Sequence, residues 1–348
     1  MQDIFNDIQP WLRANKPFAV ATVTRTWGSA PRKEGSAMAV TADMEVVGSV
    51  SGGCIEGAVI EEAQNVLKDS IPRLLTFGVS DETAWSVGLT CGGKVSVFVE
   101  KHPAFSDNLV EQGIWQALET ALRQNFPVVL VTRLNPVRYR HMLVYPEGPI
   151  IGDFGDLSDA LIRQARLAYK LRRSEQIDIS GEAFFIQVFP RKERLVVVGA
   201  AHISVPLVQF AKQLQFEVVV IDPRSIFATT ERFPVPPDQL ITDWPQEVLP
   251  GLDINEDTYA VLLTHDPKID DPALHFLLNS PVAYIGALGS RKTHAKRCKR
   301  LQEAGFPEEA IRRIQGPAGL DINALTPQEI ALSIMAEVVQ TRRHRGEA

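Results

Sequence analysis

The first half of the chain mixes strand-like and helical patterns without a regular alternation between the two. Residues 18–24 are rich in β-branched side chains and predict a strand. Apolar residues recur at helical spacing over residues 55–67 and predict a helix. Further helices are expected over residues 2–14, 108–124 and 157–171, and further strands over 37–40, 45–50, 73–77, 95–99, 128–132, 141–144 and 183–189. This half therefore predicts an α+β domain.

After residue 190 the pattern changes, because strands and helices alternate regularly. The expected strands cover residues 194–198, 216–221, 259–263 and 282–285, and the expected helices cover 203–214, 271–279, 290–304 and 326–343. This rhythm predicts a mainly parallel sheet with helices on both faces. We therefore expect an α/β fold with an N-terminal α+β domain over residues 1–190 and a C-terminal Rossmann-like domain over residues 191–348.

Length and composition agree with two domains of an ordinary globular protein. The chain has 348 residues, more than one typical core accommodates. A net charge of −6 gives no general electrostatic reason to bind nucleic acid. No apolar run is long enough to span a membrane, and the N-terminus lacks the pattern of a secretory leader. We expect a cytoplasmic protein with neither nucleic acid nor membrane as a partner.

Two short loops each combine a cysteine with a pair of glycines: Gly52, Gly53 and Cys54 in the first, and Cys91, Gly92 and Gly93 in the second. Glycine pairs bring backbone N–H groups close to a guest molecule, and such groups stabilise a nearby thiolate. Cys54 also precedes a predicted helix, whose N-terminus has the same effect. The alternative is that both cysteines are small buried residues in tight turns. Three dispersed cysteines predict neither a disulfide framework nor a structural zinc site.

The strand, turn and helix over residues 195–204 predict the opening of a Rossmann domain. Of the three glycines in the dinucleotide fingerprint only Gly199 is present, and Ala201 occupies the second position. A Cβ at that position narrows the approach of a pyrophosphate, so NAD(P) is a less favoured ligand than a single phosphate at the helix N-terminus. Asp222 ends the second strand and Arg224 follows it. The alternative for Asp222 is a turn residue.

A second glycine-rich junction between a strand and a helix contains Gly289, Ser290 and Arg291. Small residues followed by cations suit an anion, and the alternative is a tight turn with solvated charges. Two histidines, His202 and His265, are expected at the same carboxyl edge of the parallel sheet. For His265 a structural, hydrogen-bonded role is favoured over that of a general base.

Taken together, these segments resemble the XdhC/CoxI family, accessory factors of xanthine dehydrogenase and related molybdenum hydroxylases. The resemblance covers nearly the whole chain and rests on the order of its motifs, which lie at residues 28–32, 48–56, 91–93, 199–203, 222–224, 264–266, 286–291 and 319–334. The sequence departs from the family at Ala201, where a glycine is usual, and at Ser204. These departures bear on nucleotide binding more than on the fold.

The resemblance implies a maturation factor rather than an oxidoreductase. Such a factor binds molybdenum cofactor, supports its sulfuration with a cysteine desulfurase and delivers it to a xanthine dehydrogenase-type hydroxylase. A homodimer is also implied. On this interpretation, Cys54 and Cys91 contact the molybdenum, and the edge of the Rossmann sheet holds the cofactor's phosphate across a cleft shared by the two domains. The open alternatives are an NAD(P)-dependent oxidoreductase or other nucleotide-binding protein, a docking module and a thiol redox sensor.

Overall fold

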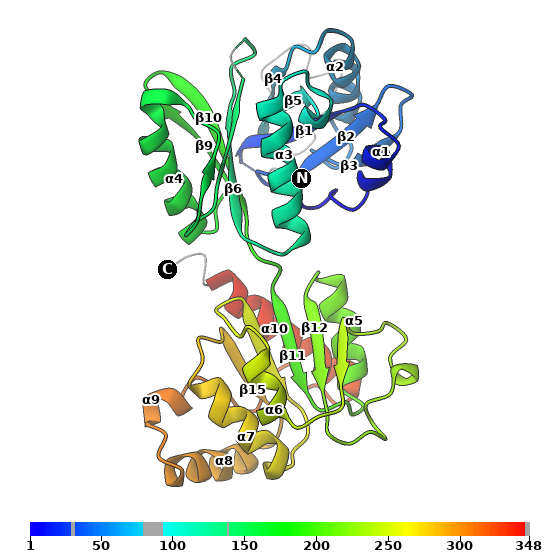
Figure 1. The fold of residues 1–348 in the computed structure, drawn as a ribbon. Helices are drawn as coiled ribbons and strands as arrows, with labels where there is room; N and C mark the ends of the chain where they lie inside the picture. The colour runs from blue at the N-terminus through cyan, green and yellow to red at the C-terminus, as the bar shows by residue number, and fades with distance from the viewer. Residues whose placement is uncertain (29–31, 79–92, 138, 345–348) are drawn as a thin grey trace. The chain divides into compact units, whose positions relative to one another are not determined.

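The computed structural model describes residues 1–28, 32–78, 93–137 and 139–344. The chain divides into two compact units, Met1–Pro190 and Arg191–Ala348. The N-terminal unit has two sheets and the C-terminal unit has one, and each unit has its own hydrophobic core (Figure 1). Both units combine helices with sheets, which confirms the predicted α/β class.

The N-terminal unit contains two antiparallel sheets, and the first has the strand order β3-β2-β1-β5-β4. Its strands are β1 (Phe18–Trp27), β2 (Ala37–Thr41), β3 (Val46–Gly48), β4 (Arg73–Phe77) and β5 (Lys94–Lys101). Helix α2 (Glu56–Asp69) packs on one face of this sheet. Its buried residues Val59, Ala63 and Val66 contact the apolar side chains of β1, β2 and β5, as the helical spacing in the sequence predicts.

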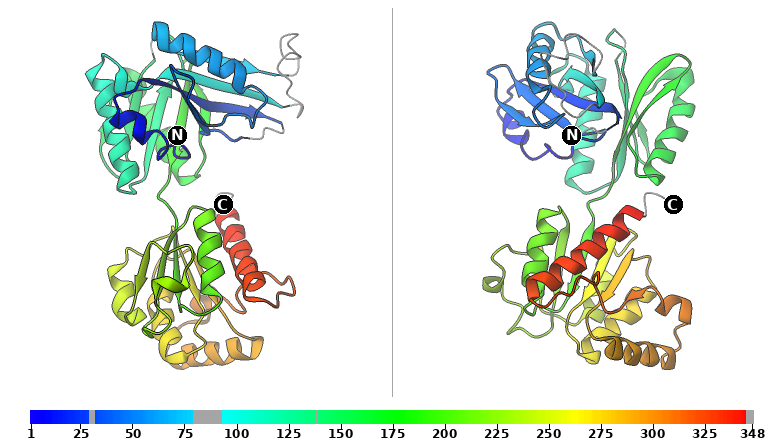
Figure 2. Two further views of the ribbon diagram at one scale, coloured as in Figure 1. Left: turned by 90° about the vertical axis from the view of Figure 1, so that its right-hand side faces the viewer. Right: turned by 180° about the vertical axis from the view of Figure 1, so that it is seen from behind.

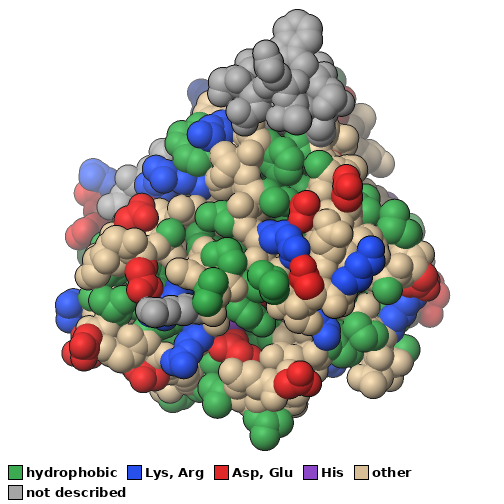
Figure 3. All heavy atoms as spheres, turned by 90° about the horizontal axis from the view of Figure 1, so that it is seen from above, with side chains coloured by type: hydrophobic (Ala, Val, Ile, Leu, Met, Phe, Trp, Pro, Cys, Tyr) green, Lys and Arg blue, Asp and Glu red, His purple; other side chains and the backbone are tan. Residues whose placement is uncertain are grey.

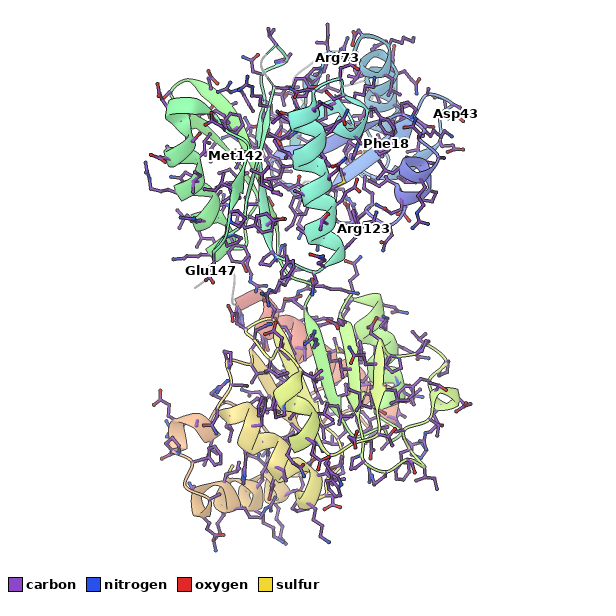
Figure 4. All side chains as sticks on the ribbon, in the orientation of Figure 1. Phe18, Asp43, Arg73, Arg123, Met142 and Glu147 are labelled. Carbon is purple, nitrogen blue, oxygen red and sulfur yellow. The ribbon has the colours of Figure 1, made fainter. Side chains whose placement is uncertain are left out.

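The second sheet has the order β8-β7-β6-β10-β9. Its strands are β6 (Val128–Arg133), β7 (His141–Val144), β8 (Ile150–Ile151), β9 (Glu175–Ile179) and β10 (Glu182–Phe189). Helix α4 (Ser158–Lys170) covers one face, and α3 (Leu109–Arg123) packs against strands of both sheets. Phe18 and Met142 are buried in two separate hydrophobic clusters of the N-terminal unit, whereas Asp43 and Glu147 point outward (Figure 4).

The helix expected over residues 2–14 is shorter in the structure, where α1 covers only Gln9–Arg13. Proline suits the first turn of a helix but not its interior, and Pro10 stands at the start of α1. The residues before α1 form turns that bury Met1, Ile4 and Ile8. Two short helical turns, η2 (Pro103–Phe105) and η3 (Gly155–Leu157), precede α3 and α4.

The C-terminal unit contains a six-stranded sheet in which every strand pair is parallel. Its strands are β11 (Arg194–Val198), β12 (Glu217–Ile221), β13 (Gln239–Ile241), β14 (Thr258–Leu262), β15 (Tyr284–Ala287) and β16 (Ile314–Gln315). Their order is β13-β12-β11-β14-β15-β16, which is 3-2-1-4-5-6 when they are counted within the unit. This is the strand order of a dinucleotide-binding Rossmann domain. The predicted mainly parallel sheet is thus confirmed.

Helices cover both faces of the parallel sheet. On one face lie α5 (Ser204–Gln213) and α10 (Pro327–His344), which run beside each other in Figure 2. The other face is covered by α6 (Pro245–Val248), α7 (Pro267–Leu278), α8 (Arg291–Glu303) and α9 (Glu308–Ile311), with the short turns η4 (Thr230–Arg232) and η5 (Leu249–Gly251) in the connecting loops. Helix α7 begins earlier than predicted, because the Asp266 side chain accepts a hydrogen bond from the Lys268 N–H and caps it.

Candidate functional site

The loop from β3 to α2 is organised around the carboxylate of Glu56. Its Oε1 accepts hydrogen bonds from the Ser49 hydroxyl at 2.7 Å and from the N–H groups of Ser51 and Gly52 at 2.9 and 3.0 Å. Its Oε2 accepts hydrogen bonds from the Ser51 hydroxyl and from the Gly53 N–H, the latter at 2.8 Å. Partial burial alone would raise the pKa of Glu56, but the hydrogen bonds from Ser51 and Ser49 outweigh burial and lower it to about 2.

The glycine pair of this loop therefore serves an internal anion. Gly52 and Gly53 have positive φ angles of 82° and 124°, which turn their N–H groups toward Glu56. The sequence indicated that these N–H groups would face a guest molecule. In the structure they are already bound to the first residue of α2. These hydrogen bonds tie the loop to α2, and the Cys54 thiol makes no hydrogen bond among the described residues.

Cys54 lies just before α2 and is half-buried. Its side chain packs against the core formed by α2 and the first sheet, and its N–H donates to the Ser51 hydroxyl at 3.0 Å. A Cβ added at the adjacent Gly53 would meet no atom within 4 Å, so the space beside that residue is open. Of the second predicted loop, Cys91 and Gly92 lie outside the described residues, and Gly93 is buried before β5. A shared role for the two cysteines stays a prediction.

The carboxyl edge of the parallel sheet is tightly packed just after the paired strands β11 and β14 end. Gly199 follows β11 with φ of 111°, and a Cβ at this position would lie 2.8 Å from Cγ2 of Thr264. Only glycine fits this close approach without strain. The next turn departs from the fingerprint but is satisfied internally, because the buried Ser204 hydroxyl donates to the Ala201 carbonyl at 2.5 Å. His202 is exposed in the same turn.

Asp222, at the end of β12, is fully buried and bound to two neighbours. Its Oδ2 accepts from the Ala200 N–H at 2.7 Å and from Nη2 of Arg224 at 2.8 Å. Its Oδ1 accepts from the N–H and the Nε of Arg224 at 3.0 and 2.8 Å. Burial favours a higher pKa for Asp222, but the hydrogen bonds from Arg224 and Ala200 prevail and lower it. The sequence placed Asp222 and Arg224 near a ligand, and the structure joins them in an ion pair.

Further along the same edge, Gly289 has φ of 142° and leads into the N-terminus of α8. The Ser290 side chain caps α8 by accepting from the Thr293 N–H at 3.1 Å, and Arg291 is exposed in the first turn. The loop is supported from within by the buried Arg297, whose Nη2 donates to the Leu288 carbonyl at 2.9 Å. The sequence reasoning missed this arginine, because it reads as one of several cations on a polar helix.

The residues after β14 contribute a second buried acid to the edge. The Thr264 hydroxyl donates to Asp270 Oδ1 at 2.5 Å, and Asp270 lies 3.8 Å from Arg297. Burial raises the pKa of Asp270, and these two partners oppose the increase. His265 adopts a left-handed conformation with φ of 59° and is exposed. No ring hydrogen bond of His265 is found within the described part of the chain, and its structural role stays a prediction.

A buried charged cluster in the N-terminal unit also escaped the sequence reasoning. His141 lies between Glu111, at 2.6 Å from Nδ1, and Glu100, at 3.3 Å from Nε2. Burial opposes a charge on the ring, but Glu100 and Glu111 together raise the pKa of His141 to about 10. The three residues come from β5, α3 and β7, so no local pattern reveals them. In the sequence, the cluster is indicated only by Glu100, a charged residue near the end of the apolar strand β5.

Neither unit presents a metal site or a membrane span in its described residues. No group of three or more His, Cys, Asp or Glu side chains there could hold a metal ion. No helix there has the length and apolar character needed to cross a membrane. The face drawn in Figure 3 mixes acidic, basic and apolar side chains rather than gathering one sign of charge.

These features define a protein that joins an antiparallel α/β unit to a Rossmann domain whose carboxyl edge is rich in paired charges. Comparison with known sequences identifies it more closely. Residues 195–338 match the XdhC Rossmann domain, and residues 11–78 match the XdhC and CoxI family. The chain belongs to the XdhC and CoxI family, as the resemblance predicts.

Three relatives cover almost the whole chain. A probable subunit of xanthine dehydrogenase from Bacillus subtilis is 29% identical over 326 residues, which are 93% of each chain. The molybdenum cofactor insertion chaperone PaoD of Escherichia coli is 25% identical over 337 residues, 97% of this chain and 87% of PaoD. A crystal structure described as a xanthine dehydrogenase from Bacillus halodurans is 30% identical, with a TM-score of 0.79 over 99% of this chain and 97% of that one.

Proposed function

We propose that this protein is a maturation factor for a xanthine dehydrogenase-type molybdenum hydroxylase. It binds molybdenum cofactor as cargo, supports the cofactor's sulfuration together with a cysteine desulfurase, and delivers the cofactor to the apo-hydroxylase. The observation that carries the proposal is the match to a molybdenum cofactor insertion chaperone over 97% of this chain. A fold alone does not assign a function, so the chemistry of the two candidate loops must also suit this cargo.

The loop at Cys54 offers a soft ligand on a rigid support. Thiolates are favoured partners of soft metal centres, and a labile cargo is best met by a group that is already positioned. Hydrogen bonds to Glu56 fix the backbone on both sides of Gly52 and Gly53. We therefore assign Cys54 to the molybdenum end of the cofactor, together with Cys91 from the second loop.

The carboxyl edge of the Rossmann domain supplies the candidate contacts to the cofactor's phosphate. Open parallel sheets bind ligands at this edge, and helix N-termini there favour anions. The residues that we assign to it are Gly199, Ala201, His202, Asp222, Arg224, Gly289, Ser290 and Arg291. Of these, Asp222 acts by holding Arg224, because its own oxygens are already hydrogen-bonded.

The proposal is tested by titrating the purified full-length protein with molybdenum cofactor and by measuring activation of an apo-hydroxylase with a desulfurase present. We expect Cys54→Ala to weaken binding at least tenfold, Cys91→Ala to weaken it as well, and Cys298→Ala to leave it unchanged. Cys298 is a matched control because it is also half-buried and belongs to the other unit. Failure of the wild-type protein to bind the cofactor or to accelerate activation would refute the proposal. If all three variants bind the cofactor as tightly as the wild type, the thiols have no part in the proposed binding site.

A second candidate function is an NAD(P)-dependent oxidoreductase, which the 3-2-1-4-5-6 strand order favours. Two features oppose it: the Cβ of Ala201 in the fingerprint loop, and the buried carboxylate of Asp222. A change in NADH fluorescence at micromolar protein would support this candidate. The predicted homodimer is tested separately by light scattering of the purified protein.

A further inference from the structure

The loop between β12 and β13 carries a second arginine, Arg232, near Arg224, which the proposed function assigns to the cofactor's phosphate. In an NAD-binding Rossmann domain, the acidic residue after the second strand accepts hydrogen bonds from a ribose hydroxyl. Asp222 occupies that position but has no exposed surface, and both of its oxygens accept hydrogen bonds from Ala200 and Arg224. A ribose diol therefore finds no free acceptor on this carboxylate.

Arg224 is presented to solvent by the same contacts. Its Nε and Nη2 donate to Asp222, whereas Nη1 has no hydrogen-bond acceptor among the described residues. Its side chain is 34% exposed, and its guanidinium carbon lies 4.6 Å from the ring centroid of Phe227. The two hydrogen bonds to Asp222 and the contact with the Phe227 ring together fix the orientation of the guanidinium. A fixed guanidinium with free N–H groups is suited to a phosphate oxygen.

A second arginine approaches the same aromatic ring. The guanidinium carbon of Arg232 lies 5.3 Å from the centroid of Phe227. The structure gives Arg232 neither an ion pair nor a side-chain hydrogen bond within the ranges it describes. Two like charges thus contact one ring, and Asp222 neutralises only one of them. The group formed by Asp222, Arg224, Phe227 and Arg232 has a net charge of +1.

Two acids follow β14, which β11 separates from β12, and both lie close enough to Arg224 to favour its charged form. Asp270 is paired with Arg297 at 3.8 Å and accepts from Thr264, and it is itself buried. Asp266 uses its side chain to cap α7. Both acids raise the pKa of Arg224, after the larger effect of its hydrogen bonds to Asp222. Within the group of Asp222, Arg224, Phe227 and Arg232, Arg232 is the charged residue that has no ion pair among the described residues.

We propose that the carboxyl edge of β12 recognises a phosphate monoester through Arg224 and Arg232, and that it does not recognise a free ribose diol. This inference deepens the phosphate contact of the proposed function by adding Arg232, and it holds whichever molecule carries the phosphate. Two sources share this chemistry: the terminal phosphate of the pterin cofactor and the 2′-phosphate of a nucleotide such as NADPH. A phosphate monoester carries nearly two negative charges near neutral pH, and its oxygens can accept hydrogen bonds from both guanidinium groups.

The test compares NADPH with NADH, which differ by this one phosphate, and includes molybdenum cofactor as a third probe. Binding to the full-length protein is measured by calorimetry for the wild type, Arg232→Gln, Arg224→Lys and Arg312→Gln. Arg232→Gln removes the charge and its contact with the Phe227 ring but breaks no ion pair in the described residues, so we expect the variant to fold. Arg224→Lys keeps the charge but loses the planar fork. Arg312 is an exposed control on the surface of the same unit, paired only with Glu308 in the part of the chain that the structure describes.

If a nucleotide is the source, NADPH binds the wild type at least tenfold more tightly than NADH, and Arg232→Gln brings the two affinities within about twofold of each other. If the pterin phosphate is the source, the same variant weakens molybdenum cofactor binding at least fivefold while the nucleotides bind equally. In either case Arg224→Lys weakens binding of the probe that responds to Arg232→Gln, and Arg312→Gln leaves the affinity for every probe unchanged. The inference is overturned if no probe responds to Arg232→Gln, including the case in which nothing binds. Cofactor binding that is strong but insensitive to Arg232→Gln would overturn this inference and leave the proposed function intact.

Discussion

Replacing Glu56 by glutamine tests whether an internal carboxylate organises the loop that carries Cys54. The substitution keeps the size of the side chain but exchanges one acceptor oxygen for an NH₂ group. That group would face donors, because the N–H groups of Ser51, Gly52 and Gly53 all point at the carboxylate. We therefore expect Glu56→Gln to destabilise the N-terminal unit and to loosen this loop.

The magnitude follows from the lowered pKa of Glu56. A change from the ordinary value of 4.5 to about 2 would correspond to roughly 3 kcal/mol, at about 1.4 kcal/mol for each tenfold change in proton affinity. Because Glu56 is only half-buried, solvent screening reduces this figure, and we expect a loss of about 1.5 kcal/mol at pH 7. The folded-state pKa is depressed, so this stabilisation is present above pH 4.5 and is lost as the pH falls toward 2.

The assay is urea unfolding followed by tryptophan fluorescence at pH 7 and at pH 3. Most of the tryptophans belong to the N-terminal unit, namely Trp11, Trp27, Trp85 and Trp115. Glu61→Gln is the matched control, since Glu61 is exposed on the same helix. The wild type should exceed Glu56→Gln in stability at pH 7, and the difference should narrow at pH 3. A difference that is absent at pH 7, or that stays the same at both pH values, would refute the role given to this carboxylate.

Three further substitutions probe other contacts. His141→Gln should lower the free energy of unfolding by about 3 kcal/mol at pH 6, because it leaves two buried carboxylates unpaired. The pKa of His141 is raised to about 10, so the advantage of the wild type in urea unfolding should be lost as the pH rises from 6.5 to 10. Gly199→Ala should lower the free energy of unfolding by about 3 kcal/mol through backbone strain and contact with Thr264, and it should lower the melting midpoint of the C-terminal unit. The control Gly251→Ala should cause no comparable shift, because its added Cβ meets no neighbour. Asp266→Ala should cost about 1 kcal/mol by removing the cap of α7, with faster amide hydrogen exchange in its first turn; unchanged exchange would contradict that cap.

The Rossmann domain was predictable because its signals are local and repeated. Three of the four strands that the pattern revealed, β11, β14 and β15, are apolar runs followed by an α-helix, and the glycine at position 199 marks the close approach of two strand ends. The outer strands could not be read in the same way. Strands β13 and β16 contain three and two residues, too few for a periodic pattern. They form because neighbouring strands offer free backbone groups to pair with.

The site was predicted less completely than the fold, because hydrogen-bond partners depend on contacts that no short pattern encodes. Glu56 reads in the sequence as an ordinary acid in the first turn of a helix, a favourable place for negative charge. Nothing in the pattern says that its side chain turns back to bind the loop before it. The cluster of Glu100, Glu111 and His141 is harder still, because its members come from three separate elements.

The two candidate loops share one feature that bears on how a ligand would be held. In each, a carboxylate of the chain already binds the backbone N–H groups that a glycine-containing turn exposes, Glu56 in the N-terminal unit and Asp222 in the C-terminal unit. A ligand anion would have to displace these carboxylates to use the same N–H groups, against several hydrogen bonds to a charged acceptor. We therefore expect ligand binding to depend on two side chains. These are the thiol of Cys54, in the loop before α2, and the guanidinium of Arg224, which Asp222 holds after β12. It follows that substitutions of these two side chains should affect ligand binding more than substitutions of the neighbouring glycines that leave the fold intact.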